Sequence, residues 1–237
     1  MSKSPSGQPD WPPAGDFSLY RTNVPYRSPE PPLAHTKPKG RWTVASGFPS
    51  RRSGYCVSYW GFEQHQFLTL AEVNPSVRSI RARPETLEWF DGSKWIEHTP
   101  DFGVYTSAGW LYCDIANPKH AESDLVAKRT RALDAGLARD GGRYRRFMPA
   151  DLRVEPRLSN SKQINDCSGP DIPEADLNKV SRVMPPDGAV DIHGVASMTG
   201  MPEGEALAAV LCLAWHGVVG ADMSAFLSFS TRVWRRR

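Results

Sequence analysis

Three acidic residues constrain this chain most, because each lies among apolar side chains or at a stiff turn. Glu63 lies on the stripe of an expected helix, four residues before Phe67. Asp101 opens an apolar segment, and Asp114 follows the apolar run 110–113. A carboxylate in such surroundings is unfavourable unless it is paired with a cation or holds a metal ion. The fold is therefore expected to gather these carboxylates around a divalent ion such as Mg²⁺, which prefers carboxylate oxygens on rigid elements.

The N-terminal segment has a different composition. Residues 1–40 carry nine of the 21 prolines. Runs such as 11–13 and 29–32 cannot continue a helix or a central strand, because proline has no backbone N–H. This composition predicts a proline-rich flexible arm. Its aromatic side chains could dock onto a partner or onto the protein's own surface, and the sequence leaves both open.

Residues 41–158 show the pattern of one α/β domain. After an extended entry at 41–53, helical spacing at 56–73 ends before Asn74-Pro75, and a long polar helix is expected at 121–137. Asp91-Gly92 is a strong hairpin signal. The expected strands are 77–80, 86–90, 94–99, 102–105, 110–115, 144–148 and 152–154. This order predicts a mixed sheet flanked by helices.

After a polar linker at 159–171, the pattern becomes helical over 172–237. Helices are expected at 174–183, at about 192–199 and at 202–217, with 218–222 and 226–229 as a wing-like return. This order of helices and strands predicts a small winged-helix-like domain. The third helix begins with acidic and then apolar residues, which favours protein docking or a structural role over reading DNA bases.

Arginines form three runs, at 78–83, at 143–146 and at the C-terminal end, 232–237. Lys and Arg exceed Asp and Glu by 29 to 26, so the net charge is only +3. Arg232, Arg235 and Arg236 lie in the C-terminal tail and are the residues expected to contact DNA phosphates. Runs of this kind are also often simple solvated surfaces.

Cysteine spacing and hydropathy indicate the compartment. None of the four cysteines forms a CxxC pair, so no zinc site is expected and disulfides are disfavoured. No apolar run is long enough to cross a bilayer, and no signal core is visible at the N-terminus. The sequence therefore predicts a cytoplasmic protein, in a bacterial cytosol or nucleoid, with no membrane partner.

An ordered set of motifs resembles the PD-(D/E)XK superfamily of restriction-endonuclease-like folds. The closest similarity is to TnsA-type endonuclease subunits of heteromeric transposases. The similarity covers roughly residues 50–165, and the segments that carry it are 58–63, 67–68, 77–80, 83–84, 99–102, 113–116, Tyr144 and 153–160. The resemblance implies a restriction-endonuclease-like mixed sheet in the first domain.

The resemblance also implies roles for particular residues. Glu63 would be the helical acid, and Asp101 and Asp114 would hold Mg²⁺. The lysine that normally follows the last acid by two residues is replaced by Ala116. Lys119 or Lys128 would then have to orient the water.

The activity implied is a Mg²⁺-dependent DNA endonuclease that nicks the 5′ ends of a transposon by phosphodiester hydrolysis, with Mn²⁺ as a substitute ion. Its partners would be DNA, a transposase subunit and an ATPase regulator. Ala116 supports an alternative, a catalytically silent subunit that binds DNA and the transposase. A stand-alone defence or repair nuclease is a third possibility. Purely structural roles are also possible for two of the acids. Glu63 could pair with an arginine, and Asp101 could be only a turn residue.

Overall fold

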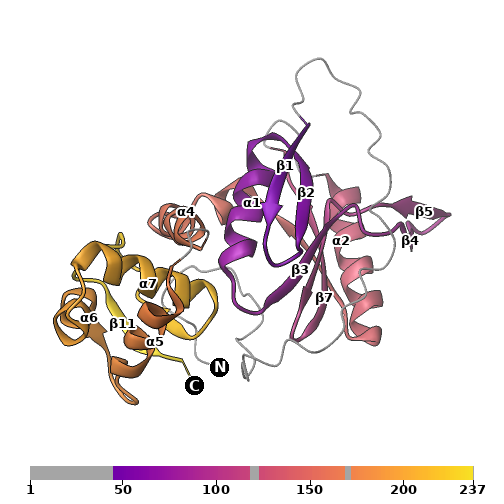
Figure 1. Ribbon diagram of the computed structural model, residues 1–237. Helices are drawn as coiled ribbons and strands as arrows, with labels where there is room; N and C mark the ends of the chain where they lie inside the picture. Colours follow the sequence, from indigo (N-terminus) through magenta and orange to yellow (C-terminus); the bar gives the residue numbers. More distant parts are fainter. Residues whose placement is uncertain (1–44, 118–122, 169–171, 237) are drawn as a thin grey trace. The chain divides into compact units, whose positions relative to one another are not determined.

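The computed structural model describes residues 45–117, 123–168 and 172–236, so the predicted arm at 1–40 lies outside the described part. The chain is a mixed α/β protein with several sheets (Figure 1). It divides into two compact units, which are described separately. Among the described residues, the first unit contains 45–68 and 76–153, and the second contains 69–75 and 154–236.

The first unit opens with a hairpin followed by a helix. Strands β1 (Ala45–Ser50) and β2 (Tyr55–Trp60) pair antiparallel, and helix α1 (Gly61–Val73) follows. The prediction of helix from residue 56 was therefore wrong for its first five residues. The β2 segment is rich in aromatic and β-branched residues that favour strands. Gly61 ends the strand with a φ of 82°, a conformation that suits glycine. The predicted helix end before Asn74 is confirmed.

A four-stranded sheet forms the centre of the first unit, in the order β3-β6-β7-β8. Its strands are β3 (Val77–Ala82), β6 (Phe102–Thr106), β7 (Gly109–Ile115) and β8 (Arg143–Phe147). Strand β6 pairs antiparallel with β3 and with β7, while β8 pairs parallel with β7. Helix α2 (Asp124–Leu137) makes the crossover that a parallel pair needs. The aromatic rings of Phe67, Phe102 and Phe147 pack together in the core beside this sheet.

A second hairpin extends from this sheet, as Figure 1 shows. Strands β4 (Leu87–Phe90) and β5 (Trp95–His98) pair antiparallel across the turn predicted at Asp91-Gly92. The carboxylate of Asp91 accepts hydrogen bonds from the backbone N–H groups of Ser93 and Lys94, at 2.7 and 2.9 Å. These bonds fix the turn locally, which explains why the sequence alone predicted it.

Two expectations between residues 149 and 168 were wrong. The predicted strand at 152–154 is absent, and Leu152 instead ends the short helix α3 (Pro149–Leu152). Proline at the first position of this helix suits a helical start. The stretch predicted as a linker at 159–171 is occupied, up to Cys167, by helix α4 (Arg157–Cys167). The polar composition of this segment led to the wrong prediction. Its residue Asn160 is buried, and its side-chain amide is hydrogen-bonded to the backbone of Ala225 and Leu227.

The second unit contains three further helices and a small sheet. The elements are α5 (Glu174–Val183), β9 (Val190–Asp191), α6 (Ile192–Thr199), α7 (Glu203–Trp215), β10 (Val219–Ala221) and β11 (Arg232–Arg235). The three strands pair antiparallel in the order β10-β11-β9. The core contains Val180, Ile192, Val210, Leu213 and Val233. The three helices confirm the sequence prediction.

The return strand of this unit differs from its predicted position. Residues 226–229 form no strand, and Phe226 and Phe229 are exposed. The basic tail supplies the strand instead, because Val233 is the apolar position that reaches the core. Among the described ranges 45–117, 123–168 and 172–236, no helix has the length and apolar character needed to span a membrane.

Candidate functional site

The structure brings two of the three predicted acids together at one end of the central sheet. Asp101 directly precedes β6, and Asp114 lies on β7. Since Phe102 pairs with Cys113, the register places Asp101 level with Asp114. The Oδ2 atom of Asp101 accepts a hydrogen bond from the backbone N–H of Ile115 at 2.7 Å. Two carboxylates thus lie on neighbouring strands.

The carboxyl group of Asp101 is unusually basic. Burial raises the pKa of Asp101 from 3.8 to about 6, and the negative charge of Asp114 acts in the same direction. The hydrogen bond from Ile115 and the positive charges of His98 and Arg83 oppose this shift. Asp101 also lines a small pocket, together with Ser58, Trp60, Gln64, Ala82 and Arg83. Near pH 6 this carboxyl group is therefore half protonated.

Asp114 has the opposite electrostatic environment, because three side chains surround its carboxylate. The guanidinium Nη2 of Arg129 lies 2.7 Å from Oδ2, and the hydroxyl of Tyr144 donates to the same oxygen at 2.5 Å. His98 Nε2 lies 3.0 Å from Oδ1 and 2.9 Å from the Tyr144 hydroxyl. Asp114, His98, Arg129 and Tyr144 are called the Asp114 cluster below.

The electrostatics of the Asp114 cluster follow from these contacts. Burial alone would raise the pKa of Asp114, but His98, Tyr144 and Arg129 outweigh it and hold that pKa below its usual value. Burial and the charge of Asp114 raise the pKa of Tyr144, so its hydroxyl stays protonated and donates. Asp114 is therefore an ionised carboxylate held by charge-assisted hydrogen bonds.

The third predicted acid, Glu63, is engaged by a different partner. Its Oε1 atom lies 2.5 Å from Nη2 of Arg153, whose Nε also donates to Gln66 at 3.3 Å. Glu63 therefore pairs with an arginine, as the alternative interpretation expected, but the Arg153 side chain is 46% exposed and does not belong to the core. Within the described residues, no group of three or more His, Cys, Asp or Glu side chains is placed to hold a metal ion.

Of the two predicted lysines, only Lys128 lies in the described part of the chain, and it does not contact Asp114. Ala116 is buried, and its backbone N–H donates to the carbonyl of Phe147 at 2.8 Å. Lys128 is exposed on α2, and Lys119 lies outside the described residues. The residue next to Lys128, Arg129, contacts Asp114 instead. Sequence reasoning missed Arg129, although its position one helical turn before the buried Leu133 was a usable signal.

The donor set therefore does not fit a Mg²⁺ ion as the side chains are placed. Three donors converge on the Asp114 carboxylate, and one of them is a permanently charged guanidinium. A divalent cation at this oxygen would face that positive charge at close range. Binding a metal ion at Asp114 would require Arg129 to leave first.

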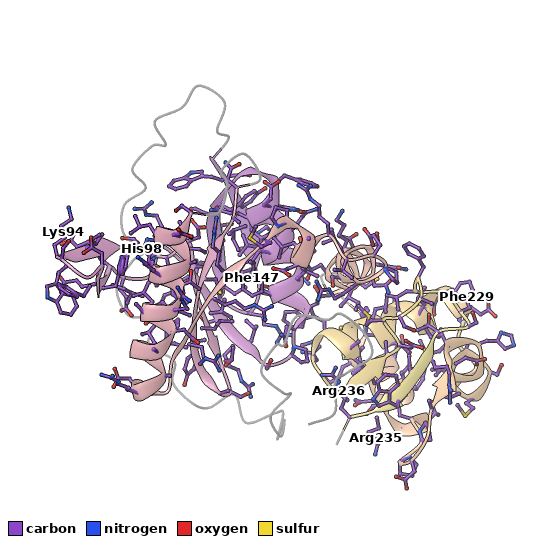
Figure 2. All side chains as sticks on the ribbon, turned by 180° about the vertical axis from the view of Figure 1, so that it is seen from behind. Lys94, His98, Phe147, Phe229, Arg235 and Arg236 are labelled. Carbon is purple, nitrogen blue, oxygen red and sulfur yellow. The ribbon has the colours of Figure 1, made fainter. Side chains whose placement is uncertain are left out.

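The basic tail is part of the second unit's sheet. Arg232 and Arg235 are exposed on β11, and Nη2 of Arg235 donates to the carbonyl of Ser181 at 2.6 Å. Figure 2 labels Arg235 and Arg236 on this strand and at its end. Arg236 is half-buried, and burial lowers the pKa of its guanidinium. The tail is thus a strand with alternating exposure.

Comparison with known proteins does not assign this chain to a family. No protein-family model matches this chain, and no curated protein matches it either. The resemblance to TnsA-type subunits therefore remains a prediction that rests on the motif residues.

Proposed function

We propose that this protein is a nuclease-fold subunit of a DNA transposition assembly that contributes binding and not hydrolysis. The observation that carries this proposal is the closed Asp114 carboxylate, which Arg129, His98 and Tyr144 occupy. Phosphodiester hydrolysis needs an open carboxylate for a metal ion and a group that activates water. The Asp114 carboxylate does not meet the first requirement, because Arg129, His98 and Tyr144 already contact it.

Two further observations support a silent site. Ala116 is 2% exposed and lies where the resemblance expects a lysine. Glu63, the expected helical acid, is neutralised by Arg153. All three acids of the motif thus remain, but two of them have arginine partners.

The architecture supports the class of protein proposed. In the first unit, an antiparallel β3-β6-β7 arrangement followed by a parallel β8 is compatible with a restriction-endonuclease-like fold. In the second unit, three helices followed by β10 and β11 are compatible with a winged-helix-like domain. The expected partners are DNA, contacted through exposed arginines such as Arg232 and Arg235, a transposase subunit and an ATPase regulator.

Nicking of supercoiled plasmid in Mg²⁺ or Mn²⁺ tests this proposal, in parallel with DNA binding measured by gel shift. We expect no metal-dependent nicking by the wild-type chain, alone or with the cognate transposase. DNA binding should persist, and Arg232→Gln with Arg235→Gln should weaken it. Nicking that disappears in both Asp101→Ala and Asp114→Ala would overturn the silent assignment.

A Mg²⁺-dependent endonuclease is the second candidate, and one observation favours it. Asp101 and Asp114 lie side by side, and the charge of Asp114 raises the pKa of Asp101. Perturbed neighbouring carboxylates of this kind are frequent at functional sites. In this case Arg129 would have to move away from Asp114 when DNA binds. Arg129→Ala, which frees the carboxylate, should then bind Mn²⁺ more tightly than the wild type in calorimetry.

A further inference from the structure

One face of the β4–β5 hairpin carries an exposed aromatic pair beside two glutamates. Cross-strand partners in an antiparallel pair lie on the same side of the sheet. The register pairs Glu88 with Glu97 and Phe90 with Trp95. All four residues are exposed, with Trp95 at 68% and Phe90 at 50%. These four residues are called the hairpin face below.

The opposite side of the hairpin fixes the direction in which the hairpin face points. Trp89 is 4% exposed and packs with Tyr112, Leu133 and Tyr144 in a buried cluster. Leu87 and Ile96 pack against the same cluster. Figure 2 shows Lys94 at the outer tip of the hairpin and His98 at its base, close to the sheet. The inner side holds the hairpin in place, so the hairpin face is directed outward.

The hairpin face is electrostatically unfavourable on its own. Glu88 and Glu97 are directly opposite each other, and like charges in this position destabilise a hairpin. Neither carboxylate has an ion-pair partner among the described residues. At the turn, Asp91 and Lys94 offset each other. Two unpaired negative charges therefore remain beside two exposed rings.

A positively charged side chain would satisfy both parts of this surface. A guanidinium or ammonium group can pair with the two carboxylates and can also stack on an aromatic ring. The rings of Phe90 and Trp95 lie 5.7 Å apart, centroid to centroid, and form one continuous aromatic surface. A nucleic-acid backbone fits poorly, because the two carboxylates would repel its phosphates.

We propose that the hairpin face is a docking surface for an arginine- or lysine-rich segment of a protein partner. The glutamates select the charge of the segment, and Trp95 and Phe90 supply the contact area for its cationic side chains. None of the four residues of the hairpin face contacts the Asp114 carboxylate, so the proposal does not depend on whether that site binds a metal ion.

Fluorescence anisotropy with the full chain tests this proposal. The probe is a labelled peptide of alternating arginine and serine, and its counterpart with glutamate in place of arginine is the negative probe. We expect the arginine peptide to bind, with affinity that falls as salt rises. Glu88→Gln combined with Glu97→Gln should weaken binding about tenfold or more, and Trp95→Ala should do the same.

The matched control also replaces two exposed glutamates by glutamine, but outside the hairpin face. Glu174 and Glu205 are exposed on α5 and α7, and the double variant to glutamine should bind the arginine peptide as the wild type does. Equal binding by the hairpin variant and this control would overturn the proposal.

Two other occupants are distinguished in the same experiment. Binding of a labelled DNA duplex by the wild type that Trp95→Ala weakens, together with no binding of the arginine peptide, would overturn the proposal in favour of nucleic acid. A dimer in sedimentation that Trp95→Ala abolishes would overturn it in favour of a second copy of this chain. All the substituted side chains are exposed, so each variant is expected to fold. Circular dichroism checks this.

Discussion

Two carboxylate–arginine pairs in the first unit have almost the same geometry and very different surroundings. Arg129 contacts Asp114 at 2.7 Å, and Arg153 contacts Glu63 at 2.5 Å. The side chains of Asp114 and Arg129 are 10% and 21% exposed, whereas those of Glu63 and Arg153 are 21% and 46% exposed. The distance between the charged atoms therefore does not distinguish the two pairs, but burial does.

The difference in burial changes what each pair contributes. In water, an ion pair gains little over its two solvated partners. In a buried cluster, neither partner can be removed without leaving an unpaired charge in a low-dielectric environment. The Asp114 cluster also includes Tyr144 and His98, so its hydrogen bonds are arranged around one carboxylate. We expect the cluster to fix the end of the sheet, and the Glu63 pair to be dispensable.

The largest effect is expected from Asp114→Ala. The substitution leaves the guanidinium of Arg129 without its carboxylate, so the free energy of unfolding should fall by about 3–5 kcal/mol. Urea unfolding at pH 7 measures this loss, and hydrogen exchange at β6 and β7 localises it. A loss below about 1 kcal/mol would contradict the idea that burial separates the two pairs. It would show that Arg129 reaches solvent as easily as Arg153 does.

The next effect concerns pH and Asp101. Its pKa is 3.8 ordinarily and about 6 in the folded protein, so the folded state holds this proton more tightly. Folding stability should therefore fall as pH rises from about 4 to about 6, by about 3 kcal/mol for this group. Asp101→Asn should remove that decline, which urea unfolding across this pH range measures. An unchanged pH profile in the variant would show that Asp101 titrates normally.

A smaller effect is expected from Tyr144→Phe. The variant keeps the ring but removes the hydroxyl that donates to Asp114, a hydrogen bond to a charged group. The free energy of unfolding should fall by about 2 kcal/mol. The pKa of Asp114 should rise at the same time, which NMR titration of its carboxyl carbon can follow. No change in either quantity would show that Arg129 and His98 hold Asp114 without help from Tyr144.

The smallest effect is expected from Glu63→Gln. Loss of this half-exposed pair should change the free energy of unfolding by less than about 1 kcal/mol, and added salt should reduce the difference further. Urea unfolding at low and high salt gives both values. A loss as large as that of Asp114→Ala would contradict the idea that burial separates the two pairs.

Local signals explain what could be predicted from the sequence. The β4–β5 hairpin follows from Asp91-Gly92, because the Asp91 side chain bonds to the backbone two and three residues later. The end of α1 at Val73 follows from the proline at position 75. In each case the determining contacts lie within a few residues of the element itself.

The errors arose where distant contacts decide the structure. Residues 56–60 have helical spacing with α1, but pairing with β1 makes them a strand. Helix α4 looked like a linker because Asn160 is polar, although residues 225–227 satisfy that side chain. The basic tail was predicted only as a run of arginines that contacts phosphates or solvent, although Val233 in its middle belongs to the core. None of these partners lies near the segment in sequence.

Composition and short spacing were enough to predict that Asp101 and Asp114 lie beside apolar segments. The partners of Asp114 could not be predicted in the same way. His98, Arg129 and Tyr144 come from β5, α2 and β8, and lie 16, 15 and 30 residues from Asp114 in the chain. Sequence spacing carries little information about such contacts, because they form only when the crossover helix and the parallel strand pack against β7. The metal site that the acids suggested and the arginine-bound cluster that the fold contains differ for this physical reason.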